Sequence, residues 1–389
     1  MVMITHRSRE SGAVSLFLVI FAMLLITIVT ISFVRLMVTD QQQATTNDLS
    51  QSAYDSALAG AEDAKRALIW YRTTCANGGD CAGAEATINS ATCNEGLSEV
   101  ITVPGDNGEV LVQQQQSAND SKLNQAYTCV KMQLETDDYI GALSPNSSKL
   151  IPLKSTDPFT TVTIEWYNRD DLGGATTTVD LLSNVQAQAN QPLYQQTDWP
   201  VTQPSLLRTQ LIQFGSSFTL ADFDTSSPAE SNANTLFLYP SGSTGSTVPV
   251  EDTWNIAAED IRRTPTGEPQ PTRCIGDLIG GGYACTVNIT LPNPVGGDAN
   301  NRTAYLRLST LYNGAHFRVS LDGTQFDGVQ PSIDSTGRAN DLFRRVETRV
   351  DLVDTNFPFP EAAVDLTGNL CKDFLVTDRA SDFVNSCTP

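Results

Sequence analysis

The chain has 389 residues and a formal charge of −20, from 24 Lys and Arg against 44 Asp and Glu. Its hydrophobic content of 40% is sufficient for packed cores and excludes a wholly disordered chain, and the length predicts two or three folded units. The acidic excess argues against nucleic acid as a partner, because binding to phosphates depends on clustered Lys and Arg.

An uncharged apolar run from Ala13 to Val34 follows a short basic leader that contains Arg7 and Arg9. As a helix the run would be roughly 33 Å long, which is enough to cross a bilayer core of about 30 Å once. The basic leader places the N-terminus in the cytoplasm and the rest of the chain outside. A cleaved signal peptide is the alternative, but the first small-x-small site, at 57–59, comes too late for one.

The apolar run continues into a segment with helical periodicity. Small and apolar residues recur every three or four positions, which predicts one continuous helix to about Arg72 with a stripe that a partner helix could approach closely. Acidic and basic residues occupy the other face, where Glu62 is spaced to pair with Arg66. The stripe consists of Leu49, Ala53, Ala57, Ala61, Ala64 and Leu68.

The leader ending in Gly12, the small residue Ala13, the apolar run and the Ala-rich helix together resemble the class III signal and first helix of type IV prepilins, closest to the PilX-like minor pilin N-terminal family. The resemblance covers about the first 72 residues. It implies cleavage by prepilin peptidase between Gly12 and Ala13, and methylation of the new amine. The implied partners are other pilins in a filament and an inner-membrane pilus assembly platform.

One position departs from most pilins. The fifth residue after the implied cut is Phe17, where most members of the family have a Glu that pairs with the amine of a neighbouring subunit. Because Phe17 cannot make that pair, the resemblance favours a minor pilin over a shaft-forming one. A plain single-pass anchor with a stalk helix is the alternative reading of residues 13–72.

All eight cysteines follow the apolar run, and an even count in an exported region favours disulfides. Eight cysteines allow 105 connectivities, among which sequence does not choose; the simplest pattern joins neighbours. No Cys-x-x-Cys pair occurs, so no metal is expected. The resemblance implies that the last pair bounds the C-terminal disulfide loop of a pilin. The neighbour pairs are Cys75 with Cys81, Cys93 with Cys129, Cys274 with Cys285, and Cys371 with Cys387.

Beyond the helix the periodicity changes to two, which predicts strands near 161–167, 206–214, 235–239 and 285–291. Alternation around Asn313-Gly314 predicts a hairpin within a four-stranded antiparallel meander at 303–353. The expected fold is α+β: a long N-terminal helix packed on an antiparallel β-sheet headgroup, with an additional β-rich inserted domain. The expected segments are a leader (1–12), the helix (13–72, with 13–34 in the membrane), a Cys-containing loop-rich segment (73–160), the insertion (161–302), the meander (303–353) and a disulfide-loop tail (354–389).

The sequence offers little for catalysis, so we do not expect an enzyme. His316 is the only histidine outside the leader, and it is expected to be a solvated strand residue. No phosphate-binding or dinucleotide motif occurs, so no cofactor is expected. Asp170-Asp171 with Gly173-Gly174, or Asp222 and Asp224, could bind calcium, but neither fits an EF-hand and solvated loops are the better reading.

The sequence therefore favours a structural minor pilin, or a pseudopilin of a secretion system, that is assembled through its helix into a cell-surface filament. Its large exported domain would serve filament initiation at the tip or adhesion, which would add a host-surface ligand to its partners. A membrane-anchored binding ectodomain outside any filament is the main alternative, and an anchored exported enzyme is the second.

Overall fold

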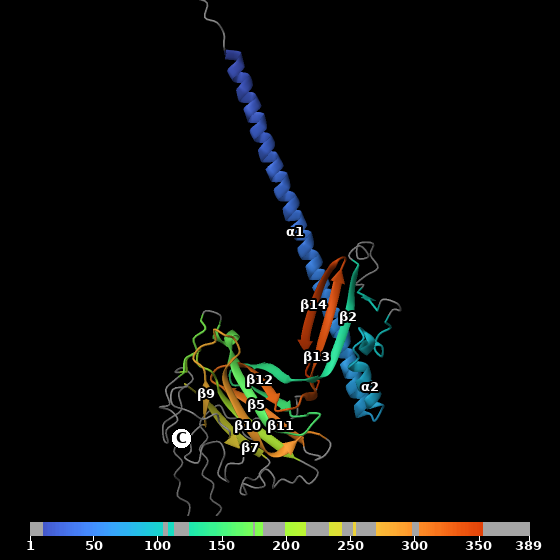
Figure 1. The fold of residues 1–389 in the computed structure, drawn as a ribbon, viewed down its shortest axis with the longest axis vertical. Coiled ribbons are helices and arrows are strands. Elements are labelled where there is room, and N and C mark those ends of the chain that lie inside the picture. Colours follow the sequence, from blue (N-terminus) through green and yellow to red (C-terminus); the bar gives the residue numbers. More distant parts are fainter. Residues whose placement is uncertain are drawn as a thin grey trace, which may run out of the picture. The chain divides into compact units, whose positions relative to one another are not determined.

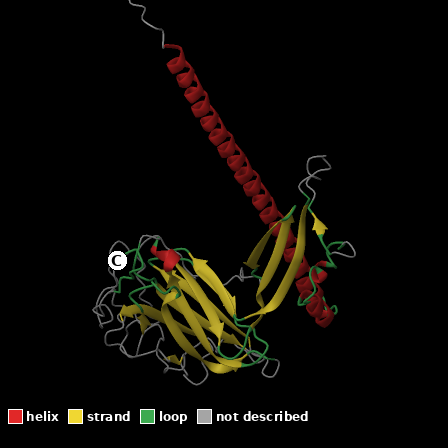
Figure 2. Cartoon of the chain, turned by 45° about the horizontal axis from the view of Figure 1, so that its top comes forward, coloured by secondary structure: helices red, strands yellow, loops and turns green. Residues whose placement is uncertain are grey.

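The computed structural model describes residues 11–103, 108–112, 124–173, 176–181, 199–214, 233–242, 252–253, 270–297 and 303–352. The chain divides into two compact units, 1–353 and 354–389. The second unit lies outside the described residues, and with it the predicted tail and the pair Cys371 and Cys387. The first unit contains a long helix, a four-stranded sheet and a ten-stranded sheet, so it is α+β as predicted (Figures 1 and 2).

The long helix α1 runs without interruption over Ser11–Ala76 and has 66 residues. At 1.5 Å per residue it is about 100 Å long. It ends where Gly78 adopts a φ of 72°, a conformation that glycine takes without steric cost. The prediction of a continuous helix that ends near Cys75 is confirmed.

The four-stranded sheet, sheet A, packs against the C-terminal half of α1. Its order is β1-β2-β13-β14, all antiparallel. Along β13 every second residue from Ile333 to Ala339 is buried against the helix side, as expected for a sheet with one solvated face. The strands are β1 (Val110–Leu111), β2 (Gln125–Thr136), β13 (Phe326–Ala339) and β14 (Leu342–Arg349).

Two short helical segments and two disulfides close the same core. The helix α2 (Cys81–Ile88) begins at Asp80, whose carboxylate accepts the Gly83 N–H, and η1 covers Glu95–Leu97. The disulfide Cys75–Cys81 joins the end of α1 to α2, and Cys93–Cys129 joins the η1 region to β2. With Cys274–Cys285, three of the four neighbour pairs are present.

The larger sheet, sheet B, has the order β3-β12-β5-β10-β9-β7-β6-β11-β4, with β8 beside β10. Its two end strands, β3 and β4, are consecutive in the chain and separated by only residues 144–147, so the sheet must curl until it is nearly a barrel. Its core includes Trp166, Phe317 and Tyr139. The strands are β3 (Asp138–Leu143), β4 (Ser148–Pro152), β5 (Phe159–Asn168), β6 (Leu206–Phe214), β7 (Ala233–Gly242), β8 (Asp252–Thr253), β9 (Gln270–Cys274), β10 (Tyr283–Val295), β11 (Thr303–Leu311) and β12 (Ala315–Leu321); η2 covers Arg169–Leu172.

The predicted meander at 303–353 is wrong in its pairing, although its four strands exist. β11 pairs with β4 and β6, whereas β12 pairs with β3 and β5, so Asn313-Gly314 does not close a hairpin. The next strand, β13, belongs to sheet A, and among these four described strands only β13 and β14 pair with each other as a hairpin. Alternation identified the strands, but it does not encode which neighbour each strand takes.

The sheets also divide the chain differently from the predicted insertion at 161–302. Every residue of sheet B lies between β2 and β13, within 138–321, and the segment expected to be rich in loops supplies β2, β3 and β4. In sheet A, Thr136 at the end of β2 is the register partner of Phe326 at the start of β13. The larger sheet is therefore inserted into a connection between two adjacent strands.

The small-residue packing of α1 on sheet A yields a first prediction. A Cβ at Gly337 would lie 2.2 Å from both the Ala53 carbonyl oxygen and the Ala57 nitrogen. Because both atoms belong to the helix backbone, Gly337→Ala should push the sheet off the helix and lower the free energy of unfolding by about 1–3 kcal/mol. Chemical unfolding of the full chain in detergent measures this. Gly280→Ala, where a Cβ meets nothing within 4 Å, is the control, and equal unfolding of both variants would contradict the packing argument.

A polar junction links the two sheets just after β14. The carboxylate of Asp351 accepts hydrogen bonds from Tyr139 Oη at 2.9 Å, Gln330 Nε2 at 3.0 Å and Lys149 Nζ at 2.5 Å. Burial raises the pKa of Asp351, but the bonds from Lys149, Gln330 and Tyr139 outweigh it, so the pKa lies below its ordinary value. The carboxylate is thus stabilised in its charged form.

The second prediction concerns this junction. A lowered folded-state pKa means that the contribution of Asp351 to stability is present above the pKa of an unfolded Asp and is lost as the pH falls through the folded value. Asp351→Asn should therefore unfold about 1 kcal/mol more easily than the wild type near neutral pH, with the difference shrinking below a pH of about 4. Urea unfolding at several pH values tests this, with Asp322→Asn on an exposed turn as the control. A difference that persists at pH 2 would contradict it.

Candidate functional site

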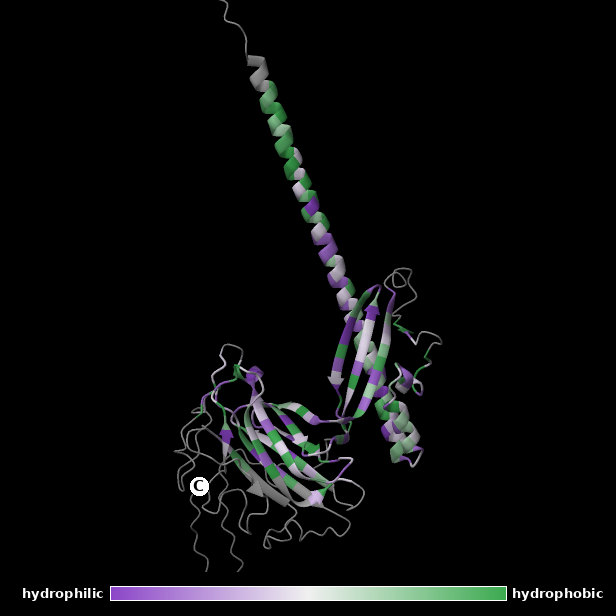
Figure 3. Cartoon of the chain, viewed as in Figure 1, coloured by the Kyte–Doolittle hydropathy of each residue, from purple (hydrophilic) through white to green (hydrophobic). Residues whose placement is uncertain are grey.

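The N-terminal third of α1 has the surface of a membrane span. Apolar side chains from Leu16 to Val38 are exposed by about half or more, and α1 is the one helix in the described part of the chain long and apolar enough to cross a bilayer. The hydroxyls of Thr27, Thr30 and Ser32 donate to backbone carbonyls one turn earlier at 2.6–2.8 Å. Lipid therefore meets no unpaired hydroxyl at these three positions. Figure 3 shows the change from apolar to mixed composition along α1.

The predicted small-residue stripe has an intramolecular partner. Ala53, Ala57, Ala61, Ala64 and Leu68 are all buried, and Leu49 above them is half-buried. They pack against the protein's own sheet A, where Ser335 Oγ donates to the Ala57 carbonyl at 2.7 Å. The expectation that a partner helix approaches this stripe is therefore wrong for Ala53 to Leu68. The helix does pack on an antiparallel sheet of the same chain, as the expected fold has it, and that sheet covers the stripe.

The opposite face of α1 is the one that remains exposed. Tyr54, Leu58 and Ile69 are 42%, 39% and 61% exposed, and at 100° per residue they lie within about 60° of one another. Asp48 and Asp55 lie beside them, on the side away from sheet A. We call these five residues the free face of α1. The i,i+4 pair of Tyr54 and Leu58 was the sequence signal for it, and it was missed because the Ala stripe is longer.

A shallow groove of about 430 Å³ lies beside Ile69, at the C-terminal end of the free face. The Arg72 side chain lines the groove and donates a hydrogen bond to the Leu352 carbonyl at 2.9 Å. The groove is mainly apolar because Ile69 and Val350 contribute to its wall. Its lining comes from α1 and from the segment after β14, namely Lys65, Leu68, Ile69, Arg72, Thr73, Ala76, Val350, Asp351 and Leu352.

The charged residues of α1 pair differently from the prediction. Glu62 pairs with Lys65 at 2.5 Å and Asp63 with Arg66 at 3.0 Å, each at i,i+3, instead of Glu62 with Arg66. Asp63 also accepts a hydrogen bond from Tyr127 Oη at 2.8 Å. Burial of Tyr127 and this bond raise the pKa of its hydroxyl. The bond fixes the helix against β2, so Asp63 is structural.

The implied processing residues lie at the start of α1. Gly12 and Ala13 fall within the helix bounds Ser11–Ala76. Phe17, at the position where most pilins have a Glu, is 76% exposed on the apolar surface of the span. A Phe there adds to the membrane anchor and carries no charge that would require a partner in lipid.

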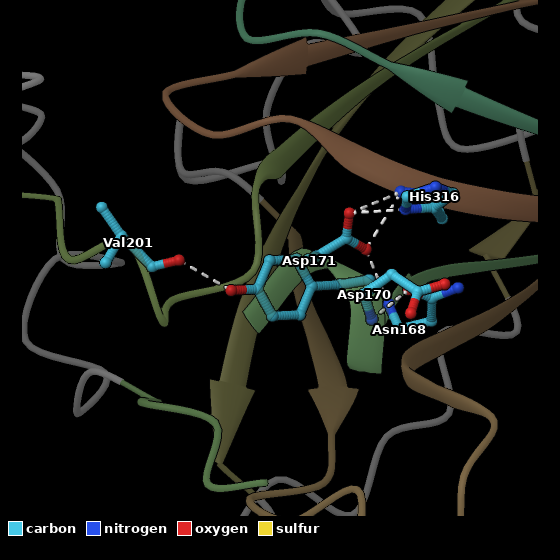
Figure 4. Close-up of polar contacts among 6 residues, drawn as sticks. Asn168, Asp170, Asp171, Val201 and His316 are labelled. Atoms are coloured by element: carbon cyan, nitrogen blue, oxygen red, sulfur yellow. Dashed lines mark hydrogen bonds and ion pairs between the residues drawn. The ribbon is translucent and has the colours of Figure 1, made fainter. Parts of the chain in front are cut away.

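A second polar cluster lies in sheet B around Asp171 (Figure 4). The carboxylate of Asp171 accepts from His316 Nδ1 at 2.8 Å, from the His316 backbone N–H and from the Asn168 N–H at 2.8 Å. The neighbouring Tyr167 donates from its hydroxyl to the Val201 carbonyl at 2.8 Å. Asp171 therefore fastens the turn η2 to the start of β12, and Tyr167 holds the loop at Val201.

The described residues of this cluster do not form a metal site. His316 is half-exposed, as a solvated strand residue should be, but it is also held by Asp171. Because the Asp171 oxygens already accept three N–H donors, the pair Asp170-Asp171 is a poor calcium ligand set. In the described ranges no group of three or more His, Cys, Asp or Glu side chains could hold a metal ion. Asp222 and Asp224 lie outside those ranges.

Asp171→Asn supplies the third prediction. An amide would present N–H groups toward the donors of His316 and Asn168, so the start of β12 should loosen and the two backbone amides should exchange faster with solvent. Hydrogen exchange followed by mass spectrometry or NMR measures this. Asp170→Asn is the matched control because Asp170 is exposed and its carboxylate makes no such bond. Equal exchange in both variants would show that Asp171 does not hold the turn.

Comparison with protein-family models, with curated proteins and with solved structures finds no match to this chain.

Proposed function

We propose that the protein is a filament subunit of the type IV pilin class, a minor pilin or pseudopilin that is stored in the membrane by α1 and assembled through it. In this proposal the leader is removed before Ala13 and the body is exported. The large β-rich body of sheet B serves filament initiation at the tip or adhesion, and the partners are other pilins, prepilin peptidase, the inner-membrane assembly platform and a host-surface ligand.

The observation that carries the proposal is the division of α1 into two halves with different surroundings. The apolar side chains between Leu16 and Val38 are exposed all round the helix, whereas the small-residue stripe from Ala53 to Leu68 is buried under a small antiparallel sheet. One continuous helix thus serves as both a membrane span and the spine of a folded domain. That arrangement allows the apolar half to exchange lipid for the helices of neighbouring subunits while the folded half stays intact.

The three disulfides support export of the body, because such bonds persist outside the reducing cytoplasm. The size of sheet B supports a tip position, because a body this large would crowd a helical shaft. Phe17 supports the same position because it lacks the carboxylate through which most shaft pilins pair with a neighbour.

The second candidate is a membrane-anchored binding ectodomain that forms no filament. It is favoured by the intramolecular burial of the Ala stripe, which removes the surface expected for helix packing between subunits. The free face of α1 decides between the two, because a filament subunit must use it and an isolated anchor need not.

The mature N-terminus gives the fourth prediction. Mass spectrometry of the protein isolated from its own membrane should find a chain that begins at N-methylated Ala13, with 12 residues removed. Gly12→Val should block the cut and leave the intact chain in the membrane, because the peptidase in this class needs a small residue there. Gly280→Val, where a Cβ meets nothing within 4 Å, is the control far from the cut. An intact Met1 in the wild type, or a cut near residue 59, would refute the pilin assignment.

A further inference from the structure

Strand β14 is the outer edge of sheet A and carries an exposed aromatic residue. Its register pairs Phe343 with Arg338 and Arg345 with Thr336, on the face of the sheet turned away from α1. Phe343 is 53% exposed and the Arg345 side chain 66% exposed. Within the described residues no further strand pairs with β14. An exposed aromatic side chain on an edge strand favours association with another chain unless other residues cover it or charges oppose the pairing.

The charge of β14 limits what can cover it. The strand contains three arginines and one glutamate, a net formal charge of +2, in a chain of −20. Arg344 reaches across to Ser50 of α1 at 2.8 Å, and Arg345 pairs with Asp334 through two bonds of 2.6 Å. Edge-to-edge pairing of two β14 strands would bring their arginines together, which disfavours that pairing. The Arg345 side chain is still 66% exposed beside Asp334, so it can also contact an acidic group of a partner.

The free face of α1 has the complementary character. Residues 36–64 contain five acidic side chains and no Lys or Arg. Among the described residues, neither Asp48 nor Asp55 forms an ion pair, and Asp55 accepts only the amide of Gln51 at 2.9 Å. Tyr54 and Leu58 lie beside them as exposed apolar neighbours. Both surfaces therefore combine exposed apolar side chains with charged ones, and the charges are basic on β14 and acidic on the free face.

We infer that β14 of one subunit docks on the free face of α1 of a second copy, with Phe343 against Tyr54 and Leu58 and Arg345 beside Asp55. The inference rests on the proposed function and names the partner of that helix. The two surfaces lie on opposite sides of the layer formed by α1 and sheet A. Two subunits therefore cannot each dock β14 on the α1 of the other at the same time. Such a head-to-tail contact adds copies in one direction and does not form a two-fold dimer, so a few copies could stack at the tip where a filament begins.

A charge exchange tests the contact in the full-length chain in detergent. Asp55→Arg and Arg345→Glu should each weaken self-association by roughly fivefold, because each places like charges together. The double variant restores opposite charges and should recover most of the wild-type association. Asp322→Arg, which makes the same charge change on an exposed turn of sheet B, should leave it unchanged. Sedimentation as a function of concentration and salt measures all four variants.

Cross-linking identifies what lies against the strand. A photoreactive residue in place of Phe343 should form an adduct with residues 48–62 of another copy, found by mass spectrometry of the cross-linked peptides. The inference would be overturned by adducts elsewhere on a second copy or on a different protein. It would also be overturned if the chain stays monomeric, or if the double variant does not recover association. Its failure is distinguishable from failure of the pilin assignment, because that assignment is read from the N-terminus at Ala13.

Discussion

The helix layer of the fold depends on how closely sheet A approaches α1. Gly60 and Gly337 lie at the contact, and a Cβ on either would fall within 2.5 Å of an atom across it. The rest of the interface is equally close because the helix presents Ala side chains there, at Ala53, Ala57 and Ala64. Small side chains bury less apolar area each, so the stability of such an interface comes from close packing along its length and from bonds such as Ser335 to the Ala57 carbonyl.

This internal contact also decides which part of the helix is available to other molecules. Once the small-residue face is covered by sheet A, only the opposite side of α1, with Tyr54, Leu58 and Ile69, can meet another protein. That side is neither purely apolar, as a membrane surface would be, nor purely polar, as an isolated stalk would be. A mixed surface of this kind suits a contact with another protein in water, in which apolar contact area and charge both contribute.

The sequence predicted the helices and strands of this fold better than it predicted which strands pair with one another. The apolar run and the Ala stripe predicted α1 to within a few residues of its end at Ala76, because helical periodicity is a local property of the chain. The strands at Leu206–Phe214 and around Val162 were predicted for the same reason. Pairing is a long-range property: β11 and β12 flank an Asn-Gly turn yet join different neighbours. The packing of the helix on a sheet was expected, but not the strand residues that cover the Ala stripe, nor the bond between Asp171 and His316, because these contacts join residues far apart in sequence.

The place where sheet B enters the fold explains how a thin helix-and-sheet layer can carry so large a body. Thr136 and Phe326 are register partners on adjacent antiparallel strands, so the chain leaves sheet A and returns to it at points only about 5 Å apart. An insertion between such points adds loop-closure entropy that grows only slowly with length. Phe326 and Val329 belong to the core of sheet B while Ile333, on the same strand, belongs to the core against α1. The helix layer and the body of sheet B therefore keep separate cores that meet along one shared strand, β13.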